Sequence, residues 1–184
     1  MASWPLTIMR SRSYIPRLAS SYGLFSALMT IVAFLVFYFI GQQPWRNLIS
    51  LILDVIIIGA FCFIAIRDFR DRHNDGILHF YHGMSIAFFV YLVTATLFSL
   101  FYLLFIAVIT PDFMEIYQES MIEFLESRKE LLIQQGGEEE FQRQIDSVGQ
   151  VQASGLVLDA FGKKVISGLV LAPIFSIVFR TIQR

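Results

Sequence analysis

Cysteine is almost absent from this sequence, and its scarcity excludes two ways in which small proteins are often stabilised. Cys62 is the single cysteine among 184 residues. One thiol cannot form an intramolecular disulfide, and it cannot build a thiolate cluster around a metal ion. Because Cys62 lies inside an apolar run, we interpret it as a small hydrophobic side chain packed in a helix.

Charged residues and catalytic motifs are also scarce. Lys, Arg, Asp and Glu make up 16% of the chain, and the formal net charge is -1. A nucleic acid partner requires a concentrated basic surface, so we expect none. The sequence contains no nucleophile elbow, no glycine-rich phosphate loop, no HExxH and no pair of acidic residues within an apolar run. We therefore expect no enzyme, no catalytic residues and no bound cofactor or metal.

Long apolar runs dominate what is present. Four of them cover residues 22–40, 48–66, 84–109 and 165–179. About 20 residues, each rising about 1.5 Å along a helix, cross the ~30 Å of hydrocarbon in a bilayer. The fourth run is short for this task, so we extend it toward Leu156. We predict an all-α integral membrane four-helix bundle in one domain, with spans at about 20–40, 48–66, 84–109 and 157–179.

Basic residues favour one orientation of these spans. Four spans place both ends of the chain on the same side, and membrane proteins retain Lys and Arg preferentially in the cytoplasm. The side with the termini would hold Arg10, Arg12, Arg17, Arg67, Arg70, Arg72, Arg180 and Arg184; the other would hold Arg46, Arg128, Lys129, Arg143, Lys163 and Lys164. We predict a multi-pass protein of a bacterial inner membrane with both termini in the cytoplasm, and an uncleaved first span, since no small-x-small cleavage site follows it.

Two spans carry small residues at every fourth position. Such spacing marks a face on which helices approach closely in lipid. The residues are Ala19, Gly23 and Ala27 in the first span and Gly168, Ala172 and Ser176 in the fourth. We predict that these faces pack tightly, against each other or against another subunit. Pro173 predicts a kink in the fourth span.

The segment between the third and fourth spans predicts an amphipathic helical hairpin over about 111–152. Thr110 could cap its first helix, and Pro111 suits a first helical position. Apolar residues then recur at three- and four-residue spacings, namely Phe113, Ile116, Tyr117, Phe124, Leu125, Leu131 and Leu132. We expect Gly136-Gly137 to end this helix, and a second short helix to carry Phe141, Ile145 and Val148. With the termini in the cytoplasm, the hairpin would be periplasmic.

The other face of the predicted hairpin is acidic. Its residues are Glu115, Glu119, Glu123, Glu126 and Glu130, and Glu138, Glu139 and Glu140 follow the glycines. Like charges at this spacing repel by a few tenths of a kcal/mol per pair. The face could be simply solvated, or it could dock a basic partner. A divalent-cation site would need an oxygen-rich loop that the sequence does not show.

Asp54 is a carboxylate inside the second span. A charge there costs several kcal/mol unless it is paired, protonated or hydrated, and is a functional candidate by default. Lys163 and Lys164 lie at a comparable depth in the fourth span, so we predict contact with one of them. The readings are a structural ion pair, a polar contact between helices through Ser50, or a proton or ion relay.

A basic loop follows the second span. It contains Arg67, Arg70 and Arg72, with His73, His79 and His82 shortly after. Histidines near Asp71 and Asp75 could hold zinc or iron, but their spacing fits no established metal motif. We interpret Arg67, Arg70, Arg72, His79 and His82 as contacts to lipid headgroups or to a partner.

Short segments throughout the chain carry a family resemblance. They are Tyr22-Gly23-Leu24, residues 64–71 (IAIRDFRD), Gly76, Gly83, Pro111, residues 165–168 (VISG) and the basic end at Arg180. The chain resembles the domain-of-unknown-function 4199 family of small bacterial inner-membrane proteins, typical of Bacteroidota. The resemblance implies four spans, a short basic loop between the second and third, and a charged helical insert between the third and fourth. It implies no activity and only loosely a neighbourhood of envelope-building enzymes.

Three functions follow as hypotheses. The leading one is a non-catalytic accessory or scaffold subunit of an inner-membrane protein complex, whose partners are membrane lipids and other membrane-protein subunits or further copies of itself. The second is a small transporter or channel that oligomerises around Asp54. The third is a lipid-linked envelope-biosynthesis protein that uses the arginine and histidine loop.

Overall fold

The computed structural model describes residues 4–45 and 47–181, and for residues 4–13 it describes the backbone alone. Arg46 and Arg184, and the side chains of Arg10 and Arg12, on which the predicted orientation partly depends, lie outside the described residues. Its elements are α1 (Trp4–Phe39), α2 (Leu48–Asp68), the π-helix η1 (Phe69–His73), α3 (Phe80–Leu104), the π-helix η2 (Phe105–Ile109), α4 (Phe113–Glu126), α5 (Lys129–Gly149) and α6 (Ala153–Val178). Within the described ranges the regular structure is entirely helical, which confirms the predicted class.

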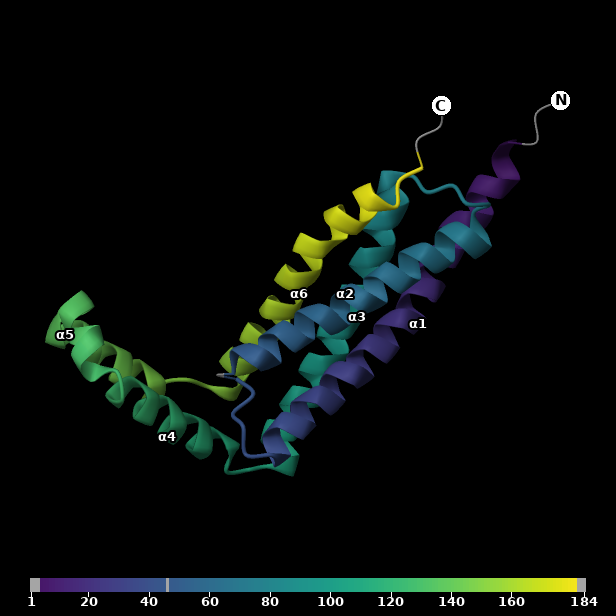
Figure 1. Ribbon diagram of the computed structural model, residues 1–184. Coiled ribbons are helices and arrows are strands. Elements are labelled where there is room, and N and C mark those ends of the chain that lie inside the picture. Colours follow the sequence, from purple (N-terminus) through teal and green to yellow (C-terminus); the bar gives the residue numbers. More distant parts are fainter. Residues whose placement is uncertain (1–3, 46, 182–184) are drawn as a thin grey trace. The chain divides into compact units, whose positions relative to one another are not determined.

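Within the part of the chain that the structure describes, four helices are long and apolar enough to cross a membrane. They are Tyr14–Phe39, Leu48–His73, Phe80–Ile109 and Ala153–Val178, shown in Figure 1 as α1, α2, α3 and α6. A helix satisfies its own backbone hydrogen bonds, which lipid tails cannot do. Large apolar side chains such as Phe39, Leu158 and Ile166 are exposed on their surfaces. These four helices support a membrane protein, and each extends the predicted span at one end: at the start in the first, third and fourth, and at the end in the second.

The chain divides into two compact units. Met1–Ser99 and Ala160–Arg184 form the first, and Leu100–Asp159 forms the second. The first unit, called the bundle below, contains α1, α2, most of α3 and most of α6. The second contains the end of α3, η2, α4, α5 and the start of α6.

All four spans contribute to the core of the bundle. Its buried residues include Ala19 from α1, Ile58 from α2, Val90 from α3 and Ala172 from α6. Ala19, Ile58 and Val90 are 0% exposed. The hydrophobic effect does not drive helices together in lipid, so the bundle depends on close van der Waals packing at this core.

The small-residue face of α1 packs against α3. A Cβ atom added to Gly23 would lie 2.8 Å from Cβ of Val93 and 2.9 Å from the carbonyl oxygen of Val90. The hydroxyl of Thr94 donates a hydrogen bond to the carbonyl oxygen of Gly23 at 3.2 Å. Only a residue without a Cβ atom permits this approach, which places a polar contact between two spans.

The small-residue face of α6 also packs against α3. A Cβ atom on Gly168 would overlap the ring of Tyr91, and a Cβ atom on Gly83 would lie 2.7 Å from Oγ of Ser176. The sequence predicted that the two small-residue faces pack against each other or against another subunit. In the structure both faces pack against α3 and not against each other. Four-residue spacing identifies a face for close approach but does not identify the helix that fills it. Pro173 lies within α6 without ending it.

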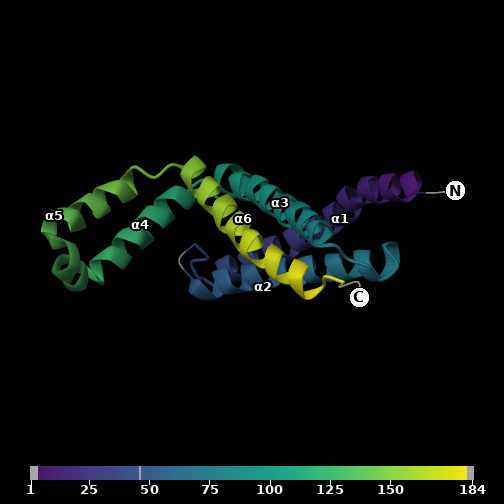
Figure 2. The ribbon, with the colours of Figure 1, turned by 90° about the horizontal axis from the view of Figure 1, so that it is seen from above.

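The second unit contains a helical hairpin with its own core. Leu125 of α4 packs with Phe141 and Val148 of α5. Figure 2 shows α4 and the second part of α5 as the arms of this hairpin, with the first part of α5 at the tip. In the structure α4 and α5 therefore pack together through apolar side chains, in the segment for which the apolar periodicity predicts an amphipathic hairpin.

The ends of the hairpin helices differ from the sequence prediction. α4 begins at Phe113 and ends at Glu126, whereas we expected it to start at Pro111 and to end at the glycines. At its end, the hydroxyl of Ser127 donates to the carbonyl oxygen of Phe124 at 2.7 Å. Gly137, with φ 81°, forms a kink inside α5. Its missing side chain permits this positive φ, so the helical conformation is broken at the glycines as predicted, and the predicted first helix is also interrupted earlier, after Glu126.

The close approach of α3 and α6 gives a test with a matched control. Gly168→Ala should lower the free energy of unfolding by about 1–3 kcal/mol, because an overpacked contact forces the helices apart. Gly162→Ala makes the same change on α6 where nothing lies within 4 Å of the added carbon, and should not destabilise. Thermal unfolding of the purified protein in detergent measures both. Equal midpoints for the two variants would contradict the packing.

Candidate functional site

An ion pair inside the bundle is the first candidate site. Asp54 comes from the second turn of α2, whose start is fixed by Asn47: its side-chain oxygen accepts the backbone N–H of Ile49 at 2.9 Å. Lys164 comes from the middle of α6. Its Nζ donates a hydrogen bond to Oδ2 of Asp54. The structure thus brings together two charges that are 110 residues apart in the sequence.

Lys164, and not its neighbour Lys163, contacts Asp54. The side chain of Lys164 is 4% exposed and that of Asp54 is 25% exposed, while Lys163 is an exposed residue. Successive residues of a helix point about 100° apart, so one of two adjacent lysines faces the bundle. The sequence predicted either lysine as the partner of Asp54, and the rotation of α6 about its axis decides which of them faces the bundle.

Aromatic rings close the pair from the other side. Nζ of Lys164 lies 3.6 Å from the centroid of the Phe98 ring of α3. That ring makes an edge contact with Phe34 of α1, with centroids 5.9 Å apart. A desolvated cation over an aromatic face gains about 2 kcal/mol. Asp54, Lys164, Phe98 and Phe34 together link all four spans of the bundle.

The buried hydroxyl groups of the bundle mostly bond within their own helices. The hydroxyls of Thr30, Thr94 and Ser176 donate to the carbonyl oxygens of Ala27, Val90 and Ala172 at 2.9, 2.8 and 2.6 Å. A proton relay needs a chain of ionisable groups. These bonds do not extend the ion pair along such a chain. Its chemistry is therefore that of mutual neutralisation within a low-dielectric core.

The acidic face of the hairpin is a second candidate. Glu115, Glu119, Glu123, Glu126 and Glu130 are all exposed. Among the residues that the structure describes, none of these five takes part in an ion pair. By contrast, Glu138 lies 3.7 Å from Lys129, and Arg143 lies 3.4 Å from Glu139 and 3.3 Å from Glu140. The five carboxylates thus retain their charge without local compensation.

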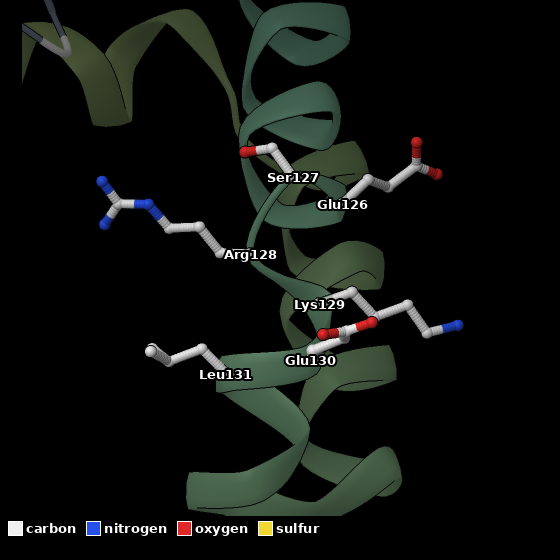
Figure 3. Close-up of a pocket in the computed structure, with 6 residues that line it drawn as sticks. All are labelled: Glu126, Ser127, Arg128, Lys129, Glu130 and Leu131. Carbon is white, nitrogen blue, oxygen red and sulfur yellow. The ribbon is translucent and has the colours of Figure 1, made fainter.

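The turn between α4 and α5 forms an open surface hollow. Its lining is Glu126, Ser127, Arg128, Lys129, Glu130 and Leu131. Figure 3 shows Arg128 and Leu131 pointing to one side of the turn and Glu126 and Lys129 to the other. The guanidinium of Arg128 lies 4.3 Å from the centroid of the Phe124 ring. Because the side chains diverge, the hollow does not enclose a ligand.

The arginines of the predicted basic loop lie in helices, Arg67 in α2 and Arg70 and Arg72 in η1. Acidic residues of the same segment are their partners. Arg67 and Arg70 both contact Asp71, at 3.4 and 2.7 Å. Arg72 contacts Asp68 at 3.2 Å. The Arg67–Asp71 spacing of four residues could have revealed that pair.

The three histidines of this region lie in different surroundings. His79 and His82 have ring centroids 5.4 Å apart, and His82 also contacts Phe69 at 5.4 Å. The ring of His73 stacks on Tyr14 of α1 at 4.3 Å. Among the described residues, no group of three or more His, Cys, Asp and Glu side chains is placed to hold a metal ion. The structure thus brings His79 and His82 together and places His73 against another helix.

The comparison with protein families settles the resemblance seen in the sequence. A family model described as "Protein of unknown function (DUF4199)" matches residues 21–181. The chain belongs to the DUF4199 family. No curated protein and no solved structure matched it. Membership in DUF4199 confirms the predicted relationship and leaves the function to be argued from the residues themselves.

Phe98 is a site residue that sequence reasoning missed. Its side chain is buried, and Phe98 is 4% exposed. Its contact with Lys164 depends on how α3 and α6 lie side by side. No local pattern around residue 98 distinguishes it from the other phenylalanines of the third span.

The ion pair predicts an unequal response to single and double substitution. Asp54→Leu should lower the free energy of unfolding by about 3–5 kcal/mol, because it leaves a buried cation without its partner. Adding Lys164→Met should restore at least half of that loss, since the remaining groups are apolar. Denaturation in detergent micelles measures the three proteins.

Lys163→Met serves as the control for this series. It removes a neighbouring exposed charge and should change stability by less than about 0.5 kcal/mol. A double variant as unstable as Asp54→Leu alone would show that uncompensated charge is not the source of the loss.

Proposed function

We propose that this protein is a non-catalytic accessory or scaffold subunit of a protein complex in a bacterial inner membrane. Both termini lie in the cytoplasm, and the hairpin of α4 and α5 is periplasmic. The bundle anchors the subunit in lipid, and the acidic face of the hairpin docks a basic partner.

The uncompensated charge of the hairpin is the observation that carries this proposal. The exposed glutamates of α4 and the start of α5 stand three or four residues apart, where they repel each other by a few tenths of a kcal/mol per pair. The neighbouring Glu138, Glu139 and Glu140 have basic partners within the hairpin. A basic surface on another subunit would provide ion-pair partners for the exposed glutamates of α4 and the start of α5, as Lys129 and Arg143 do for Glu138, Glu139 and Glu140.

The closed interior of the bundle supports a structural role in the membrane. Lys164 and Asp54 neutralise each other, and Phe98 covers the cation. The small residues Gly23 and Gly168 are used for packing on α3 within the chain. Partner subunits would therefore meet the exposed apolar faces of the spans or the hairpin, and not these two glycines.

Contacts at one end of the bundle support a common side for both termini. Tyr14, in the first half of α1, stacks on His73 after α2. The backbone N–H of Thr181 donates to the carbonyl oxygen of Leu78 at 3.0 Å. Figure 1 shows the start of α1 and the end of α6 toward the same end of these helices. The arginines of η1 lie at this end, as expected for a cytoplasmic side.

The docking proposal predicts a loss of partner when the acidic face is neutralised. Glu119, Glu123 and Glu126 changed together to Gln remove three charges while keeping side-chain size. Affinity purification of the tagged full chain from native membranes in mild detergent, followed by mass spectrometry, should show the partner reduced at least about tenfold, since electrostatic complementarity directs such contacts.

The matched control is Glu138, Glu139 and Glu140 changed together to Gln, which removes the same charge from the compensated group. That variant should retain the partner. Isolation of the unaltered protein as a lone monomer, or equal retention by both triple variants, would contradict the docking proposal.

A small transporter or channel is the second candidate. It is favoured by the 25% exposure of the Asp54 side chain, which leaves its carboxylate accessible from outside the pair. Under the scaffold proposal, proteoliposomes should show no ion flux above protein-free vesicles, because the paired charges offer no continuous polar path. Flux that disappears in Asp54→Asn and persists in Lys163→Met would establish the transporter instead.

A further inference from the structure

The end of α2 continues into the π-helix η1, and this segment carries three arginines, Arg67 in α2 and Arg70 and Arg72 in η1. Ile66, the last residue of the continuous apolar run, is 0% exposed, and Arg67 follows it directly. η1 then continues from Phe69 to His73. π-helical turns are rare and often lie at functional sites. Because the first guanidinium follows the apolar run directly, we expect it near the depth at which the headgroup layer begins.

One carboxylate holds two of these arginines side by side. Nε of Arg67 lies 3.4 Å from Oδ2 of Asp71, and Nε of Arg70 lies 2.7 Å from Oδ1 of the same residue. Both guanidinium groups thus use the inner nitrogen. Within the described part of the chain, the structure records no hydrogen bond from the terminal Nη atoms of either arginine. We call this arrangement, formed by Arg67, Asp71 and Arg70, the arginine clamp.

Arg70 is also held in place by contacts with the residues that follow α6. Its guanidinium carbon lies 5.1 Å from the centroid of the Phe179 ring. Its carbonyl oxygen accepts the N–H of Gly76 at 2.8 Å, and the hydroxyl of Thr181 donates to the carbonyl oxygen of Gly76 at 3.0 Å. Gly76 has φ 76°, a conformation that glycine adopts without strain. The loop after η1 is thereby bound to the residues that follow α6, and Arg70 is positioned before any ligand arrives.

The positive charge of the arginine clamp is only partly neutralised. Two guanidinium groups share one carboxylate, which leaves one net positive charge. A guanidinium presents a planar fork of N–H donors that matches the oxygens of a phosphate group. The free Nη donors and the excess charge fit the same type of ligand, an anionic oxyacid that accepts several hydrogen bonds.

We propose that the arginine clamp binds the phosphate group of an anionic phospholipid. The position of Arg67 directly after the apolar span selects a lipid over a soluble phosphate, because the headgroup layer lies at this depth. Binding at this end of the bundle would anchor η1 and its loop to the membrane surface. The inference concerns a site in the bundle and is independent of the partner assigned to the hairpin.

Charge-conserving substitutions distinguish the clamp from simple attraction to an anionic surface. In Arg67→Lys/Arg70→Lys the charge stays and the planar forks are lost. The purified full chain in detergent should bind phosphatidylglycerol at least tenfold more tightly than phosphatidylcholine with the same acyl chains. The double variant should lose about tenfold in affinity for phosphatidylglycerol, since lysine does not replace a bidentate arginine. Lipid retention in native mass spectrometry measures each affinity.

Asp71→Asn gives the sharpest contrast. This change adds net positive charge, so general electrostatics predicts tighter binding. The clamp predicts binding weakened about fivefold, because Asp71 no longer orients the two guanidinium groups. Tighter binding by Asp71→Asn, or wild-type affinity in the double lysine variant, would overturn the proposal.

Arg72→Lys is the matched control. Arg72 lies on the same π-helix, bonds to Asp68 and has a 79% exposed side chain, so its replacement should leave the affinity unchanged. If the double variant fails to fold in thermal-unfolding and gel-filtration tests, Arg67→Lys alone decides. Its side chain is 63% exposed, and an unchanged affinity in that variant would also overturn the clamp.

A competition arm separates the two sources of phosphate. Sodium phosphate added at the concentration of the bound lipid should not displace phosphatidylglycerol. Full displacement by inorganic phosphate would overturn the assignment to a lipid. Equal binding of phosphatidylglycerol and phosphatidylcholine would show that the clamp does not select the anionic headgroup.

Discussion

Lipid tails offer neither hydrogen bonds nor a hydrophobic incentive for helices to associate, and the architecture of this protein follows from that constraint. The backbone polarity of each span is satisfied within its own helix. Association must then come from close contact between helices. Both α1 and α6 make such contacts with α3. Gly23 of α1 approaches Val90 and Val93, and Gly168 of α6 approaches Tyr91. The third span is consequently the helix against which the small-residue faces are built.

The same constraint governs where charge can be placed. Inside the bundle, Asp54 and Lys164 contact each other, and the ring of Phe98 lies against the cation. At the end of α2, three arginines share two carboxylates in and next to η1. In the hairpin, one group of glutamates is compensated and another is exposed without compensation. Charge is therefore neutralised most completely in the bundle core and least completely on the surfaces where binding is proposed.

Sequence reasoning succeeded where the signal was local and repeated. Runs of about 20 apolar residues identified the spans, because helix rise and bilayer thickness set that length. It was less reliable where ends depend on single hydrogen bonds. The sequence predicted one helix from Pro111 to Gly136-Gly137, yet Ser127 closes α4 earlier, and the predicted break at Gly137 therefore falls inside α5. A glycine permits a positive φ in a turn or in a kink, and its neighbours decide between the two.

The candidate sites show the same division. Asp54 was identifiable as a costly buried charge and its partner could be narrowed to two adjacent lysines. The choice of Lys164 required the rotation of α6. Phe98 could not be selected from many phenylalanines, and the shared bonding of Arg67 and Arg70 to Asp71 depends on the path of the π-helix. These contacts are set by distances between side chains, which spacing along the chain constrains only within one regular helix.

The amino-acid sequence by itself indicated that lipid surrounds this protein, and it indicated the number of spans and the helical class. It also identified the polar residues that need a partner in lipid. Each of these depends on composition over one or a few turns of helix. Tertiary structure decided which helix fills each small-residue face, which lysine meets Asp54, and which guanidinium groups stand side by side. Those outcomes depend on how separate helices are rotated and placed, and that arrangement results from the packing of all four spans together.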